Sequence, residues 1–239
     1  MDRVLAWSLA IAAVGGLVRG TTGFGASMVM TPALALLLGA RVAVPVALLL
    51  ETFAAAPMIP AALALARWRA IAPICASAVA TVPVGALLLG SASPLTLRRL
   101  IAATVALFSL ALLSGRRYAG APRLRTALGL GALSGTLLGA TSVGGPPVIL
   151  YLLSGPDPVP VTRANLTLYV IVISAAGLVM LGAAGLLSAP TLARAAALAL
   201  PFGAGVVAGG RAFARFSDRR FRQFTIGFML VVSLGVLLA

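Results

Sequence analysis

The chain contains few of the side chains that catalyse reactions or bind metal ions. Its 239 residues include no His, one cysteine, Cys75, and only four acidic residues. Without His, imidazole metal sites and Ser-His or Cys-His catalysis are excluded. A single cysteine excludes an intrachain disulfide and a thiolate metal cluster. We therefore expect no metal site, no cofactor and no enzymatic activity.

Charged residues are also scarce. They make up 9% of the chain, whereas a soluble domain has about 25%. Hydrophobic residues make up 61% of the chain, and the mean hydropathy is +1.12. This composition leaves too little polar surface to cover a water-soluble globule. Because the apolar runs are long, the sequence predicts an all-α polytopic membrane protein that contacts membrane lipid.

The charge that is present is mostly of one sign. The net charge is +14, and all 18 basic residues are arginines. In a soluble protein this excess would indicate a nucleic-acid partner. Here most arginines gather in loops between apolar segments, as the positive-inside rule expects, so we expect no nucleic acid. If the arginine-rich loops near residues 67–69, 116–125, 163 and 211–222 face the cytoplasm, both termini face outward.

Ten apolar segments divide the chain. Lipid offers the backbone no hydrogen bonds, so each segment is predicted to be helical. The third, fourth, eighth and ninth segments are long enough to span a bilayer, which takes roughly 20 residues. The segments beside two Gly-rich breaks are short, and we expect half-helices that meet inside the membrane or short tilted spans. The segments lie near residues 4–18, 26–38, 42–66, 70–90, 97–114, 125–140, 145–154, 162–187, 191–210 and 220–238.

The two Gly-rich breaks look like copies of one motif. Three glycines recur at a constant offset: Gly16, Gly20 and Gly25 match Gly135, Gly139 and Gly144. The chain is therefore predicted to be one membrane domain built from two repeats, residues 1–118 and 122–239, with five segments each. An odd number of segments inverts the second repeat relative to the first. Paired, interrupted segments of this kind indicate a transporter binding site.

Each break is predicted to turn the chain sharply and to begin a second, short helix. Glycine permits such turns, and Pro146 and Pro147 suit the first turn of a helix. The free N–H groups and the dipole at a helix N-terminus attract anions, and Thr and Ser hydroxyls add donors. Other glycines are predicted to let helices pack closely. These are Gly131, Gly135 and Gly139, and the pair Gly205 and Gly209.

Three polar side chains stand out among the apolar segments. Arg19 could grip a carboxylate, sulfite or sulfonate with two parallel hydrogen bonds, or lie at the membrane surface. Glu51 could carry a coupling proton, pair with an arginine such as Arg19, or serve only the structure. Asn165 could bind substrate or another helix. The predicted substrate-binding residues are Arg19, Gly20, Thr21, Thr22, Gly23, Gly25, Ser27, Thr141, Ser142, Gly144, Gly145, Pro146 and Asn165, with Glu51 as the proton-coupling candidate.

The second break carries the motif Gly-x-x-x-Gly followed by Gly-Gly-Pro-Pro-x-x-Leu-Tyr-Leu-Leu, over residues 135–153. This motif resembles the sulfite exporter TauE/SafE family, and residues 16–32 add weaker support. The first break departs from the family, because Gly25-Ala-Ser replaces a glycine-rich run. The resemblance implies a bacterial cytoplasmic-membrane transporter, usually an exporter, of small sulfur oxyanions or organosulfonates such as sulfite or sulfoacetate. It does not fix the ligand.

Together these patterns predict an all-helical secondary transporter. A small anionic substrate would bind near the bilayer midplane, between residues 20–27 and 139–147, and alternating access would expose the site to each side in turn. No nucleotide-binding motif is present, so direct drive by ATP is not expected. The alternatives are a passive anion channel, a transporter of a small carboxylate, and a partner subunit without transport of its own. A homo-oligomer is compatible with the sequence.

Overall fold

The computed structural model describes residues 2–22, 25–114, 123–153, 155 and 157–213, and within these ranges every regular element is a helix. In chain order they are α1 (Asp2–Thr22), α2 (Ala26–Leu38), α3 (Ala40–Ala55), the 3-10 helix η1 (Ala56–Met58), α4 (Ile59–Leu65), α5 (Trp68–Ser91), α6 (Pro94–Leu113), α7 (Leu124–Thr141), α8 (Gly145–Leu153), α9 (Val159–Ala183) and α10 (Ala189–Phe213).

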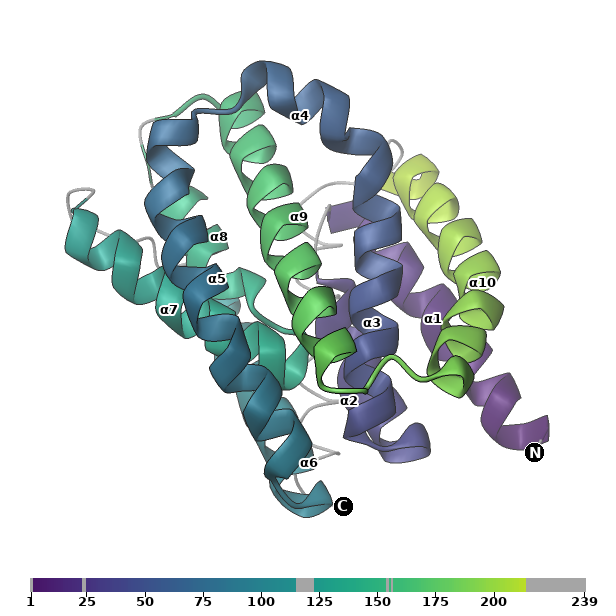
Figure 1. Cartoon of the computed structure of the whole chain (residues 1–239). Helices are drawn as coiled ribbons and strands as arrows, with labels where there is room; N and C mark the ends of the chain where they lie inside the picture. The colour runs from purple at the N-terminus through teal and green to yellow at the C-terminus, as the bar shows by residue number, and fades with distance from the viewer. Residues whose placement is uncertain (1, 23–24, 115–122, 154, 156, 214–239) are drawn as a thin grey trace.

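Six stretches of the described chain are long and apolar enough to cross a membrane. They are α1, the run from α3 to α4, α5, α6, α9 and α10. The prediction of an all-α polytopic membrane protein is therefore confirmed. The run from α3 to α4 bends near its end. Pro57 lies in η1 and Pro60 is the second residue of α4. Proline supplies no backbone N–H, so the helical hydrogen bonds are interrupted there. As a result α4 arches from α3 to α5 (Figure 1).

The short helices α2 and α8 follow the two Gly-rich breaks, where the sequence predicts them. They have 13 and 9 residues, fewer than the roughly 20 that a full span takes. The first break turns at Gly25, whose φ is 84°, and the second turns at Ser142, whose φ is 59°. Both values lie in the left-handed region, which reverses the direction of the chain. The tenth predicted segment, residues 220–238, lies outside the described residues.

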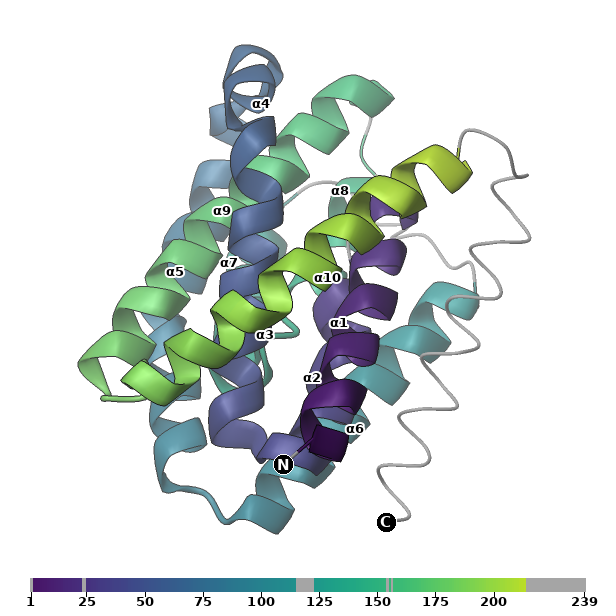
Figure 2. The same ribbon diagram turned by 90° about the vertical axis from the view of Figure 1, so that its right-hand side faces the viewer.

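Two pairs of helices pack so closely that only glycine fits between them. The pair α1 and α10 and the pair α5 and α7 lie on opposite sides of the central helices α3 and α9 (Figures 1 and 2). A Cβ atom on Gly16 would lie 2.0 Å from the carbonyl oxygen of Phe202, and one on Gly135 would lie 2.0 Å from that of Ala78. The predicted packing glycines Gly131, Gly139, Gly205 and Gly209 make similar contacts, which confirms their role.

Each of these pairs joins one predicted repeat to the other. Helices α1 and α5 lie within residues 1–118, whereas α7 and α10 lie within residues 122–239. In this arrangement the first segment of each predicted repeat packs against the fourth segment of the other repeat. The junction between the repeats lies outside the described residues, and the two-repeat division stays a prediction.

The turns of the bundle fall at two ends. The α4–α5 junction, the start of α9 and the end of α10 lie at one end, at the top of Figures 1 and 2. The start of α1, the α5–α6 turn and the α9–α10 turn lie toward the other end. Arg67, Arg163 and Arg211 belong to the first set of segments. The arginines assigned to the cytoplasmic side in these segments therefore share one end of the molecule.

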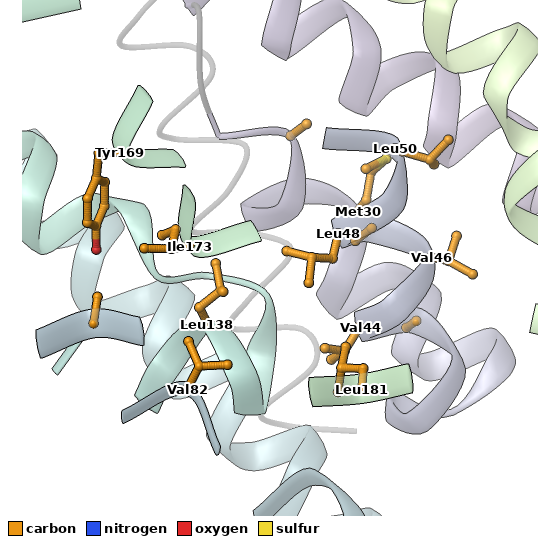
Figure 3. Close-up of a cluster of buried hydrophobic side chains, with 14 of the residues drawn as sticks. Met30, Val44, Val46, Leu48, Leu50, Val82, Leu138, Tyr169, Ile173 and Leu181 are labelled. Atoms are coloured by element: carbon orange, nitrogen blue, oxygen red, sulfur yellow. The ribbon is translucent and has the colours of Figure 1, made fainter. Parts of the chain in front are cut away.

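The apolar core surrounds α3 and α9. Figure 3 shows Met30 and Leu48 on one side of it, and Leu138, Val82 and Ile173 on the other. Helix α3 is buried along most of its length, and Glu51 lies on its buried part. This burial is what places Glu51 at the site described next.

Candidate functional site

A pocket lies where the two breaks approach each other. Residues from α1, α2, α3, α7, α8 and α9 line it. Its polar side chains are Arg19, Ser27, Glu51, Ser142 and Ser174. Its apolar wall includes Met28, Leu138, Ile149, Val170 and Ile173, of which Leu138 and Ile173 appear side by side in Figure 3. The breaks themselves contribute Gly25, Val143, Gly145 and Pro146.

Arg19 brings a positive charge into this pocket. It lies in the last turn of α1, and its exposed fraction is 6%. The ion pair found in the described part of the chain joins Arg67 to Asp157, and no hydrogen bond or ion pair of Arg19 is found there. A guanidinium has five N–H donors, and burying it without a partner is costly. An anion bound in the pocket would supply the missing partner.

Glu51, on α3, binds the start of α2. Its Oε1 accepts a hydrogen bond of 2.9 Å from the backbone N–H of Ser27, and both residues are buried. Ser27 is the second residue of α2, and the capping residue Gly25 has no side chain to accept this bond. Glu51 therefore acts, from another helix, as an acidic N-terminal cap. The ion pair with Arg19 that the sequence allowed is not formed, although both residues line the pocket.

Hydroxyl groups hold the second break. Ser142 Oγ and Thr31 Oγ1 lie 2.6 Å apart, which ties the break to α2. Tyr169 donates a hydrogen bond to Ser134 Oγ, and Ser134 in turn donates one to the carbonyl oxygen of Gly144. This chain of hydroxyls fixes the backbone just before α8 begins. The second break is thus held without any charged side chain.

The starts of the two short helices differ in the donors they offer. At α2 the first residues, Ala26 and Ser27, both carry a backbone N–H, and the N–H of Ser27 donates a hydrogen bond to Glu51. At α8 the second and third residues are Pro146 and Pro147, which have no N–H. The start of α8 therefore contributes its dipole but fewer hydrogen bonds than the start of α2. Residues at both starts line the pocket.

Several residues of the predicted site are used elsewhere. Thr21 donates to the carbonyl oxygens of its own helix, and Thr141 bonds Leu137 O and Val143 N–H. A Cβ on Gly20 would lie 2.1 Å from Val206 O, so this glycine serves the packing of α1 on α10. The Thr22 side chain and Gly23 lie outside the described residues. Gly144 holds the break through its carbonyl and is not among the pocket residues.

Asn165 lies in a separate polar cluster at the start of α9. Its Oδ1 accepts the backbone N–H of Arg67 at 2.8 Å, and its Nδ2 donates to Asp157 Oδ2 at 3.4 Å. Asp157 also forms the ion pair with Arg67. The cluster joins α9 to the start of α5, which fits the alternative in which Asn165 binds another helix. A role of Asn165 in substrate binding stays a prediction. Its place outside the pocket lining does not favour that role.

Sequence reasoning missed Ser174. It lies in the middle of α9, on an apolar stretch without glycine breaks, and it is fully buried. The residue lines the pocket. A lone serine among apolar residues is a weak signal, because such residues usually bond their own helix. Only the packing of α9 against α3 and α7 shows which way it faces.

The model of the family described as sulfite exporter TauE/SafE matches residues 8–236, which is nearly the whole chain. No curated protein and no solved structure matches the chain.

Proposed function

Because the chain belongs to the sulfite exporter TauE/SafE family, we propose that it is a secondary transporter of small sulfur-containing anions, such as sulfite and short organosulfonates. The family consists of membrane transporters rather than enzymes, and its description supplies the class of substrate. The observation that carries the proposal is Arg19, a buried cation that lines the pocket and has no ionic partner among the described residues.

The substrate would bind between the starts of α2 and α8. Arg19 would hold two oxygens of the anion in a bidentate fashion, and the two helix dipoles would add to the attraction. Rocking of one group of helices against the other would open the pocket to each side of the membrane in turn. Export is the direction that the family description supports. The resemblance to the family supports a bacterial cytoplasmic membrane, and the arginine distribution supports an outward position of both termini.

Glu51 is the proposed coupling group. Among the described residues that line the pocket, the ionisable ones are Arg19 and Glu51. An ionised Glu51 places a negative charge at the start of α2, where it competes with an incoming anion. Protonation would remove that charge and still leave an oxygen to accept the Ser27 N–H. Anion binding is therefore expected to accompany proton binding by Glu51.

Uptake into proteoliposomes tests the main proposal. We expect saturable uptake of sulfite or a short sulfonate by the wild type and its loss in Arg19→Ala. Arg99→Ala, which removes an exposed arginine of α6, is the matched control and should transport normally. Absence of uptake of every sulfur anion under either pH gradient would refute the substrate class. Preferred uptake of matched carboxylates, or ohmic currents without counterflow, would indicate the two alternative activities.

The coupling proposal has its own test. Glu51→Gln keeps an oxygen for the Ser27 N–H and cannot lose a proton. We expect this variant to transport, with uptake that no longer responds to an imposed pH gradient. An unchanged response in a transport-active variant would remove Glu51 from the coupling mechanism.

A further inference from the structure

Two buried serine hydroxyls have no hydrogen-bond partner among the described residues. They are Ser109 on α6 and Ser174 on α9, and both side chains are fully buried. Leaving a buried hydroxyl without a partner is unfavourable. Each of the two sites therefore calls for an explanation, and of the two serines only Ser174 lines the pocket.

The hydroxyl of Ser174 also departs from the behaviour of similar groups in this chain. Serine and threonine within a helix commonly donate to the carbonyl oxygen four residues earlier. Ser8 and Thr52 do so, at 2.8 Å from the oxygens of Val4 and Leu48. Ser174 makes no such bond. Its donor is therefore not used by the described helix backbone.

The surroundings of Ser174 leave few other partners. Its pocket neighbours on α9 are Val170 and Ile173, and Leu138 and Ile149 belong to the same wall. These side chains offer no acceptor. A ligand oxygen that enters the pocket beside Arg19 would give this hydroxyl an acceptor.

We infer that Ser174 is a specificity-determining residue, which donates a hydrogen bond to the third oxygen of a bound sulfite or sulfonate. The inference rests on the proposed function. The guanidinium of Arg19 has a planar fork that matches two oxygens of an anion. A carboxylate has only those two oxygens, whereas sulfite and sulfonates have a third. A hydroxyl on the apolar wall of the same pocket would therefore select for the three-oxygen anions.

Binding of two ligands that share a methyl group tests this role. Sodium methanesulfonate and sodium acetate are titrated against the purified full-length protein and its Ser174→Ala and Ser109→Ala variants. Because hydrogen bonds to charged groups are strong, Ser174→Ala should weaken methanesulfonate binding about tenfold to hundredfold. Its acetate binding should change by less than about twofold. Ser109→Ala removes an equally buried, equally unpaired hydroxyl away from the pocket, and both affinities should stay at the wild-type value.

The possible results separate the two proposals. Unchanged methanesulfonate affinity in Ser174→Ala, or an equal loss for both ligands, overturns the role of Ser174 and leaves the transporter assignment intact. A wild type that binds no sulfonate and no sulfite overturns the proposed function, and the inference falls with it. Folding is checked by thermal unfolding, where both alanine variants should be at least as stable as the wild type, because each loses an unsatisfied polar group.

Discussion

The break between α1 and α2 and the break between α7 and α8 border one pocket, and they differ in how their polar groups are satisfied. At the first break a carboxylate from α3, Glu51, caps the new helix, and a buried cation, Arg19, stands beside it. At the second break hydroxyls of Ser134 and Tyr169 hold the backbone. At the repeat position that matches Arg19, the second break has Leu138, which lines the same pocket.

This difference shows that equal backbone breaks can carry unequal chemistry. The first break is charged and supplies backbone donors, so it is suited to gripping an anion and to changing its own charge. The second break has two prolines at the start of its helix and no charged side chain, so it is suited to shaping the pocket. If the proposed function holds, anion binding and coupling depend mainly on the first break.

Replacing Arg19 with Leu should produce the largest effect, because it gives the first break the residue of the second. The pocket would lose its only described cation and two charge-assisted hydrogen bonds. We expect the affinity for sulfite, measured by counterflow in proteoliposomes, to fall by about a hundredfold or more. Arg99→Leu, at an exposed position of α6, should leave it unchanged. Wild-type affinity in Arg19→Leu would show that the two breaks do not differ in anion binding.

The next effect concerns the stability of the first break. Glu51→Leu leaves the buried N–H of Ser27 without an acceptor, and we expect a loss of about 1–3 kcal/mol. Glu51→Gln retains an acceptor oxygen and should lose less. In thermal unfolding of the detergent-solubilised proteins, we expect the unfolding temperature to fall from the wild type to Glu51→Gln and further to Glu51→Leu. Equal stability of the Leu and Gln variants would mean that the capping bond contributes nothing.

Tyr169→Phe tests the second break in the same way, with a smaller effect. The change removes one neutral hydrogen bond to Ser134 and should cost about 0.5–1.5 kcal/mol of stability. It leaves the charges of the pocket unchanged, so the affinity for sulfite should stay within about twofold of the wild-type value. A large loss of affinity with little loss of stability would instead assign binding to the second break.

Asn165→Ala should have the smallest effect on transport. Asn165 joins α9 to the start of α5 through Arg67 and Asp157, away from the pocket. We expect a lower unfolding temperature and an unchanged KM for sulfite in proteoliposomes. A raised KM at normal stability would return Asn165 to the binding site and extend the comparison beyond the two breaks.

The amino-acid sequence by itself determined the helices, the breaks and the family. Apolar runs in lipid must satisfy their backbone internally, and glycine and proline act on the chain within a few residues of where they stand. For this reason α2 and α8 begin where the pattern places them, and the packing glycines could be recognised from their spacing. These features depend on residues that are close together in the sequence, so the sequence alone predicts them.

The tertiary structure alone decided which polar groups meet. Glu51 caps a helix that begins 25 residues before it, and Asn165 bonds a backbone 98 residues away. Ser174 lines the pocket, and its hydroxyl has no partner among the described residues. Each outcome depends on the rotation of one helix against another, which residue types do not encode. The reason is that lipid drives no particular helix face inward by hydrophobicity alone, so close packing and polar contacts between distant segments set the final arrangement.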